Sequence, residues 1–406
     1  MYNGVEHKDT NHLNLITVCL YVLMFVYAIS YSITGPLMPA LIKEYNLKVS
    51  QSGLIASVQS IGAVLAILLI GLITDRIGKA KLIAISFIVF CLSILFISMA
   101  PVYTVLLLLL FIFGASSRAV DVISNAYVAD IHPDKKGVLI LLLHAVFGVG
   151  AIIGSFYPGL LLENGFTWDR TFAFLADISI LAEIIFVIVL VIVYLRRKGM
   201  KSVAIKNKKV PYKLLATPKM LMICLIMFLF VGFQFGVTVW LPSFMKGYLH
   251  SNFFLSGLAL TIFWVGTTLG RFVYSLFYKL FIPHKIILWS CMLSCLLIIA
   301  GVMSRSVSIV IIATGVTGFL TGCVVPLLFT MSCNLNPEYT GASSSMVSLS
   351  SAVSMMFFSW LIGMVSGIVG FEYGMLVTAF CLMFCSIATM ISMRINFRDK
   401  SIRGEL

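Results

Sequence analysis

Long apolar stretches alternate with short polar breaks along this whole sequence. Each stretch reaches about 20 residues, the length at which an α-helix crosses the hydrocarbon core of a bilayer. Apolar and polar residues do not alternate within the stretches, which excludes the strands of a membrane β-barrel. We therefore predict twelve transmembrane helices, at residues 14–39, 51–74, 81–100, 102–128, 137–162, 168–195, 218–245, 254–278, 284–303, 306–332, 341–368 and 371–394.

The composition supports this assignment. Of the 406 residues, 61% are hydrophobic and only 11% are charged, whereas soluble domains carry about 25% charged residues. A soluble enzyme, a secreted disulfide scaffold and a nucleic-acid-binding protein are thereby excluded. The net charge of +13 then reflects basic loops beside a lipid bilayer rather than an acidic partner.

The basic residues predict the orientation. With the N-terminus inside, cytoplasmic segments hold 21 of the 28 Lys and Arg residues and the outer loops hold five. Positive residues concentrate on the cytoplasmic side of membrane proteins. We therefore expect both termini to be cytoplasmic in a multi-pass protein of the cell membrane.

A basic segment at residues 196–217 divides the chain into an N-terminal six-helix bundle, residues 1–195, and a C-terminal six-helix bundle, residues 218–406. The two parts resemble each other at an offset of 204 residues. Ser52-Gly53-Leu54 recurs as Ser256-Gly257-Leu258, and HPDKKG at 132–137 recurs as NPEYTG at 336–341. Parallel repeats of this kind place a binding site between the halves, near the middle of the membrane.

The nine cysteines lie within or at the ends of apolar stretches. Cys291 and Cys295 are four residues apart, as are Cys381 and Cys385, so a metal-binding pair is one interpretation. Buried free thiols that pack as small hydrophobic groups are the other, and we favour it. No metal or other cofactor is expected.

A short motif follows the second predicted helix. Gly71-Leu72-Ile73-Thr74-Asp75-Arg76-Ile77-Gly78-Lys79-Ala80-Lys81 combines a helix end, an Asp-Arg pair and basic residues. By itself it could be a tight, positively charged cytoplasmic turn. Between the second and third of twelve helices, it resembles the signature loop of the major facilitator superfamily (MFS), Gly-x-x-x-Asp-Arg/Lys-x-Gly-Arg-Arg/Lys, from which Lys79 and Ala80 depart.

The resemblance implies the MFS fold, an all-α membrane protein with twelve transmembrane helices in two pseudo-symmetric six-helix bundles. It also implies that Gly71, Asp75 and Arg76 form a cytoplasmic gate. Asp130, at the end of the fourth helix, is placed to join that cluster of charges. A solvated carboxylate at a helix end is the alternative for Asp130.

Charged residues inside the predicted helices are functional candidates, because a charge in a membrane costs several kcal/mol unless it is paired or faces water. Arg118, Asp121 and Asn125 share one face of the fourth helix with Gly114. The positions of Asp121 and His144 predict equal depths in two antiparallel helices. Together these residues would bind substrate and relay protons, or Arg118 and Asp121 would form a structural ion pair that joins the fourth and fifth helices.

Other polar and aromatic residues are further candidates. Glu183 could pair with Arg118, while Asp177 lies nearer the outside, and the sequence leaves both roles open. In the second half, the substrate-binding candidates are Gln234, Trp240, Trp264 and Arg271. Aromatic rings with a few amides and charges suit a small polar solute, since rings stack on sugar faces.

LLLHAVFGVGAIIGSF at 141–156 resembles the fifth helix of the fucose-permease and sodium–glucose-transporter-like branch of MFS, as does GVTVWLPSFM at 236–245. In that branch the position of His144 contacts the sugar. Residues 15–42 lack the carboxylate that fucose permeases carry there, so proton coupling would rest on Asp121.

We expect a monomeric secondary active transporter that moves a small-molecule solute, a sugar, with H⁺ as the coupling ion, by symport. A drug or metabolite exporter that works as a proton antiporter is the alternative, and a non-transporting receptor is a third possibility. No ATP-binding loop or catalytic triad points to an enzyme.

Overall fold

The computed structural model describes residues 3–132, 136–196, 217–276, 282–336 and 339–402. Within these ranges the ordered elements are all helices, and twelve segments are long and apolar enough to cross a membrane. The predicted number of transmembrane helices is therefore confirmed. The expected linker, residues 196–217, lies almost wholly outside the described residues.

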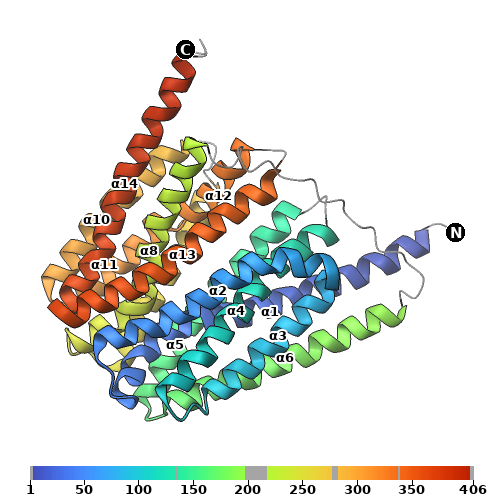
Figure 1. Ribbon diagram of the computed structural model, residues 1–406, viewed down its shortest axis with the longest axis horizontal. Helices are drawn as coiled ribbons and strands as arrows, with labels where there is room; N and C mark the ends of the chain where they lie inside the picture. The colour runs from blue at the N-terminus through green and yellow to red at the C-terminus, as the bar shows by residue number, and fades with distance from the viewer. Residues whose placement is uncertain (1–2, 133–135, 197–216, 277–281, 337–338, 403–406) are drawn as a thin grey trace.

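Among the described residues, the first half of the chain has six helices and the second half has seven (Figure 1). The first six are α1 (Asn3–Glu44), α2 (Val49–Ile77), α3 (Lys79–Ile97), α4 (Tyr103–Ile131), α5 (Lys136–Glu163) and α6 (Trp168–Arg196). The others are α8 (Pro218–Gly247), α9 (Phe253–Leu276), α10 (Pro283–Ser304), α11 (Val307–Thr321), α12 (Val324–Leu335), α13 (Thr340–Val369) and α14 (Phe371–Ile402).

The tenth membrane span, predicted as one helix, is broken. α11 ends at Thr321 and α12 begins at Val324. Pro326 has no backbone N–H, so the carbonyl of Gly322, four residues earlier, loses its usual helical donor. By contrast, Pro36, Pro39 and Pro242 lie inside α1 and α8, which continue past them.

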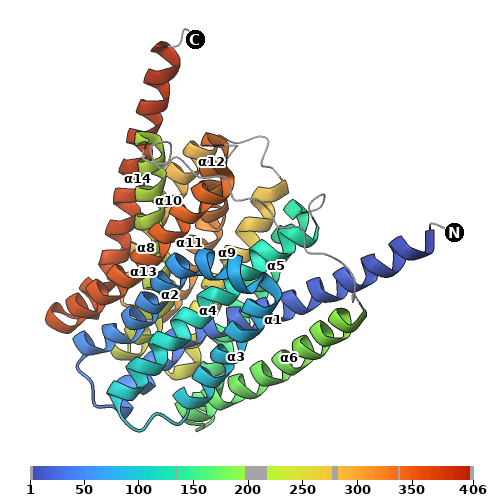
Figure 2. The same ribbon diagram turned by 45° about the vertical axis from the view of Figure 1, so that its right-hand side comes forward.

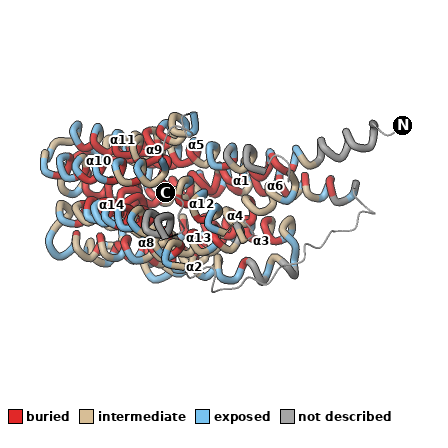
Figure 3. Tube along the Cα trace, turned by 90° about the horizontal axis from the view of Figure 1, so that it is seen from above, coloured by how far each residue is buried: buried red, intermediate tan, exposed pale blue. Residues whose placement is uncertain are grey.

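The two groups of helices diverge toward the end of the molecule that carries both termini and meet at the opposite end (Figures 1 and 2). α2 packs along α13 and α5 packs along α9, and α1 also contacts α8, so several pairs of helices join the halves. Buried residues line the interior of each group, while exposed ones lie on the outside (Figure 3). Many exposed side chains are large and apolar, including Leu108 and Leu296, as a lipid-facing surface requires.

The sequence repeat is also a repeat of packing. A methyl group added to Gly62 would lie 2.1 Å from the carbonyl oxygen of Phe111, and one added to Gly266 would lie 2.2 Å from that of Gly315. Both residues of the second pair are 204 positions after those of the first. Only glycine permits these close approaches, so α2 packs on α4 in the way that α9 packs on α11.

Candidate substrate site between the two halves

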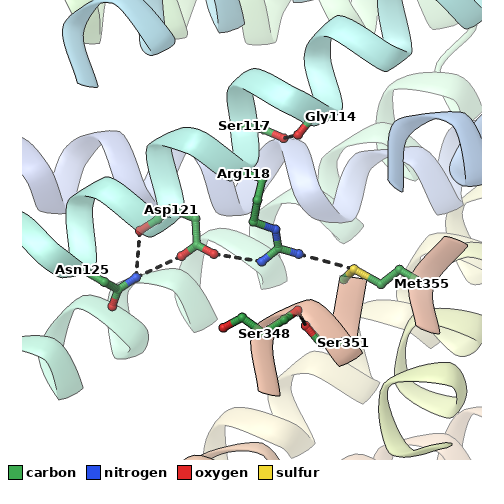
Figure 4. A network of polar contacts seen from close by, with 8 residues as sticks. All are labelled: Gly114, Ser117, Arg118, Asp121, Asn125, Ser348, Ser351 and Met355. Atoms are coloured by element: carbon green, nitrogen blue, oxygen red, sulfur yellow. Dashed lines mark hydrogen bonds and ion pairs between the residues drawn. The ribbon is translucent and has the colours of Figure 1, made fainter. Parts of the chain in front are cut away.

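An ion pair lies on the face of α4 that the sequence singles out (Figure 4). Nη1 of Arg118 donates to Oδ2 of Asp121 at 2.9 Å, and the two side chains are 14% and 16% exposed. Nδ2 of Asn125 donates to Oδ1 of Asp121 at 3.0 Å. Asp121 therefore has a charged and a neutral donor from its own helix, and the ion pair does not join α4 to α5.

The second half of the chain faces this network through α13. Nη2 of Arg118 donates to Sδ of Met355 at 3.4 Å, and Ser348 and Ser351 lie opposite the ion pair (Figure 4). The sequence analysis predicted this helix but named no site residue on it. Seven of the twelve residues from Ser343 to Ser354 are serines, a polar run inside a membrane span that could have identified α13 as a lining element.

A small pocket lies beside Arg118 and is lined by residues of α1, α2, α4, α8 and α13. Oε1 of Gln59, a lining residue, is buried without a hydrogen-bond partner, as is Nε of Arg118. A buried polar atom without a partner is costly, so a ligand that bonds to these two atoms is favoured. Gln59 could have been found by searching the predicted helices for lone amides.

Aromatic rings from both halves surround Tyr31 of α1. The Tyr31 ring centroid lies 5.5 Å from that of Phe147, 5.7 Å from Phe235 and 6.0 Å from Trp264. Trp264 is buried and its Nε1 has no hydrogen-bond partner. These rings form an apolar wall with a polar edge. Of the aromatic candidates from the sequence, only Trp264 belongs to this wall.

His144 lies close to charges from two other helices. It is exposed, yet it interacts electrostatically with Asp121 of α4 and Arg271 of α9. An exposed side chain between charged groups of both halves faces the space between them rather than lipid. His144 is therefore within electrostatic range of a charged residue from each half of the chain.

Arg271 is held at the break between α11 and α12. Its Nε donates to the carbonyl oxygen of Gly322 at 3.0 Å. This is the carbonyl that Pro326 leaves without a helical donor. The bond fixes the guanidinium at the inner face of α9, where it is partly accessible.

Two candidates from the second half, Trp240 and Gln234, are buried in α8. Nε1 of Trp240 donates to the carbonyl of Ser359 at 3.2 Å, and its ring packs against Gly363. Trp240 therefore belongs to the packing of α8 on α13, and its assignment to the substrate site is corrected. Gln234 is buried in α8 beside Phe235, a residue of the pocket.

The acidic candidates of α6 are not part of the site. Glu183 is 6% exposed, and neither carboxylate oxygen has a hydrogen-bond partner. The possible Arg118–Glu183 pair is absent, because Arg118 pairs with Asp121. Asp177 is exposed on the same helix.

Of the expected gate, only part is described. The side chains of Asp75 and Arg76 and the surroundings of Gly71 are not described, although the backbone of all three residues belongs to α2. Asp130 forms an ion pair with Lys79, the motif residue at the start of α3. Asp130 is thus tied to the motif loop rather than left as an isolated carboxylate.

In the described ranges, no group of three or more His, Cys, Asp or Glu side chains is arranged to hold a metal ion. The Sγ atoms of Cys291 and Cys385 lie 3.6 Å apart between α10 and α14. The cysteines are free, and most are buried, as expected for thiols that pack as small hydrophobic groups.

Hydrogen bonds between the halves close the end opposite the termini. Oγ of Ser57 donates to the carbonyl of Met356 at 3.1 Å, and Oε2 of Glu163 accepts from the backbone N–H of Phe253 at 3.0 Å. The two groups of helices diverge on the other side of the molecule (Figure 2).

Residues 20–303 match the Major Facilitator Superfamily, which is more than half of the chain. The chain belongs to this superfamily. An uncharacterised MFS-type transporter of Yersinia pestis is 23% identical over 76% of this chain and 78% of its own length. A D-xylose transporter of Levilactobacillus brevis is 28% identical over 32% of this chain and 29% of its own length.

A solved MFS-like structure shares the fold. The crystal structure of a bacterial homologue of the human lysosomal transporter Spinster, inward-facing and unoccupied, covers 96% of this chain and 98% of its own at a TM-score of 0.77. The identity is 14%, so this similarity concerns the fold alone. As a member of the superfamily, the protein is a transporter that spans the bilayer with twelve helices and binds a small-molecule solute.

Proposed function

We propose that this MFS protein is a proton-coupled symporter of a sugar or a closely related small polar solute. Residues 1–195 and 218–406 would be the two bodies that rock against each other, exposing the central site to each side in turn. The protein would be a monomer in the cytoplasmic membrane of its cell, with both termini cytoplasmic. It would belong to the fucose-permease and sodium–glucose-transporter-like branch.

One observation carries the proposal. The Arg118–Asp121 pair lies at the boundary of the two halves, next to the pocket that Arg118 lines with residues of α1, α2, α8 and α13. A carboxylate there can accept a proton, and its ion pair with Arg118 and hydrogen bond with Asn125 would change when it does. Such a change links protonation to the contacts of α4 with α13.

The lining suits a ring with hydroxyl groups. Tyr31 and Phe235 line the pocket with aromatic rings, and the buried Oε1 of Gln59 can accept a hydrogen bond from a hydroxyl. Similarity to a D-xylose transporter over a third of the chain supports the same class of solute.

The test is a solute-induced pH change in lightly buffered cells that express the protein. Hexoses, pentoses, deoxysugars and the corresponding sugar acids are added one at a time. Alkalinisation with one solute, absent in Asp121→Asn, is the expected result. No response to any of them would contradict sugar–proton symport and favour an exporter, which efflux assays then address.

A further inference from the structure

The positive charge of Arg271 has no acidic partner. Among the described residues, no carboxylate forms an ion pair with it, and the ionisable side chains that interact with it electrostatically are Tyr31, Cys323 and His144. Tyr31 and Cys323 are uncharged near neutral pH. Arg118 differs, because Asp121 neutralises it.

Only part of the hydrogen-bonding capacity of the Arg271 guanidinium is used within the protein. Its one hydrogen bond to described residues runs from Nε to the carbonyl oxygen of Gly322. The two Nη groups make none, and the side chain is partly accessible. Two adjacent Nη groups present parallel N–H donors at the spacing of the two oxygens of a carboxylate.

The charges around the space between the halves do not balance. Arg118 and Arg271 are cationic, Asp121 is anionic, and His144 lies among them. With a neutral imidazole, one positive charge is in excess. An uncompensated charge inside a membrane is costly, and a solute with one negative charge would remove it. A phosphate ester carries nearly two negative charges at neutral pH and would overshoot.

The residues near Arg271 indicate what kind of group carries the negative charge of the solute. Trp264 precedes Arg271 by seven residues on α9, so both lie on one face of that helix about two turns apart. Tyr31 packs on Trp264 and also acts electrostatically on Arg271. Tyr31 is the partly accessible ring of this pair and lines the pocket. A ring against Tyr31 would leave a carboxylate substituent on the side of Arg271.

We infer that the transported solute carries one carboxylate, which binds the Nη groups of Arg271 while its ring lies against Tyr31. This assignment rests on the proposed transport function and narrows its substrate class. Sugar acids and aromatic acids share the required chemistry.

A purely structural role for Arg271 would explain its bond to Gly322 but not the free Nη groups. Pro326→Ala restores a backbone N–H at the position that normally donates to the Gly322 carbonyl. The double variant Arg271→Gln/Pro326→Ala therefore removes the cation and returns a donor to this carbonyl. It separates anion binding from support of the helix break.

The experiment is isothermal titration calorimetry on the purified full-length protein with matched acid and neutral pairs. D-glucuronate is compared with D-glucose, and benzoate with benzamide. One acid should bind at least tenfold more tightly than its neutral partner. Arg271→Gln, alone or with Pro326→Ala, should bring that ratio close to one, while Arg271→Lys keeps part of it.

Arg305→Gln is the control, because this arginine lies at the closed end and is largely exposed. It should leave the ratio unchanged. Two results would overturn the inference. One is an equal weakening of acid and neutral partner in Arg271→Gln that Pro326→Ala reverses, which would show a structural role. The other is the absence of acid binding. Neutral sugars that drive proton uptake without acid binding would leave the proposed symport standing. Acid binding without a proton flux would support the inference about Arg271 and contradict the proposed proton symport.

Discussion

Gly53 of α2 faces Gly363 of α13 at the closed end of the molecule, and a methyl group on Gly53 would lie 3.3 Å from the Cα atom of Gly363. A methyl group on Gly257 of α9 would lie at the same 3.3 Å from the Cα atom of Gly159 of α5. Gly257 and Gly363 follow Gly53 and Gly159 by 204 residues each. The glycine contact between α2 and α13 and the one between α5 and α9 are therefore copies of one another, which suits a rocking motion about a shared axis.

A bulky residue at either contact is expected to favour the state that is open at this end. Gly53→Leu and Gly257→Leu should each shift the balance between the two states by about 1–3 kcal/mol, the usual cost of overpacking. Double electron–electron resonance between labels on Gln51→Cys and Ile368→Cys should report a longer distance in Gly53→Leu.

Leu54→Phe is the control for this shift, because Leu54 is the next residue and is exposed on the outside of α2. It adds bulk without entering the contact, so the distance should stay the same. An unchanged distance in Gly53→Leu as well would show that the glycine contact does not set the balance.

Asp121→Asn is expected to abolish accumulation against a gradient while solute exchange continues. The amide keeps the shape and a hydrogen-bonding oxygen for Arg118 but cannot carry the proton. Counterflow and proton-driven uptake in proteoliposomes measure the two activities separately. Loss of both, with loss of binding, would make Asp121 a solute ligand rather than the coupling residue.

Glu183→Leu is expected to stabilise the protein by about 1–3 kcal/mol, since it removes a buried carboxyl group without hydrogen-bond partners. Thermal unfolding in detergent measures this change. Uptake should be unaffected, because α6 contributes nothing to the pocket lining. Asp177→Leu, at an exposed position of the same helix, should change stability less. Loss of proton-driven uptake in Glu183→Leu would assign Glu183 to the proton pathway.

The two buried tryptophans should behave differently. Trp264→Ala removes the ring next to Tyr31 and should weaken solute binding by about 0.5–1.5 kcal/mol, the value of an aromatic contact. Trp240→Phe loses the hydrogen bond to Ser359 and should cost a similar amount of stability, about 0.5–1.5 kcal/mol. Calorimetry and thermal unfolding tell the two effects apart, and weaker solute binding in Trp240→Phe would return Trp240 to the site.

Much of the site followed from one rule about membranes. A charge in an apolar helix is conspicuous, so Arg118, Asp121 and Arg271 could be selected from the sequence. The rule does not show which of the charged side chains form ion pairs with one another. Helical spacing left both Asp121 and Glu183 as partners of Arg118, and side-chain packing selected Asp121.

The residues missed by the sequence analysis are mostly uncharged. Tyr31, Phe147 and Phe235 look like ordinary core residues in a chain with 31 phenylalanines and 15 tyrosines. They become a wall of the site only because α1, α5 and α8 converge there. Trp240 shows the opposite error, since an outlying aromatic in the sequence turned out to be packing between two helices.

The sequence by itself determined the number of membrane spans, the repeat at 204 residues and the family, because these depend on local hydrophobicity and on spacing along the chain. The tertiary structure alone decided which end of the molecule is closed and that Arg271 reaches the carbonyl freed by Pro326. Contacts of this kind join residues far apart in the chain. Their geometry depends on how close two backbones can approach, and no periodicity within one helix encodes that distance.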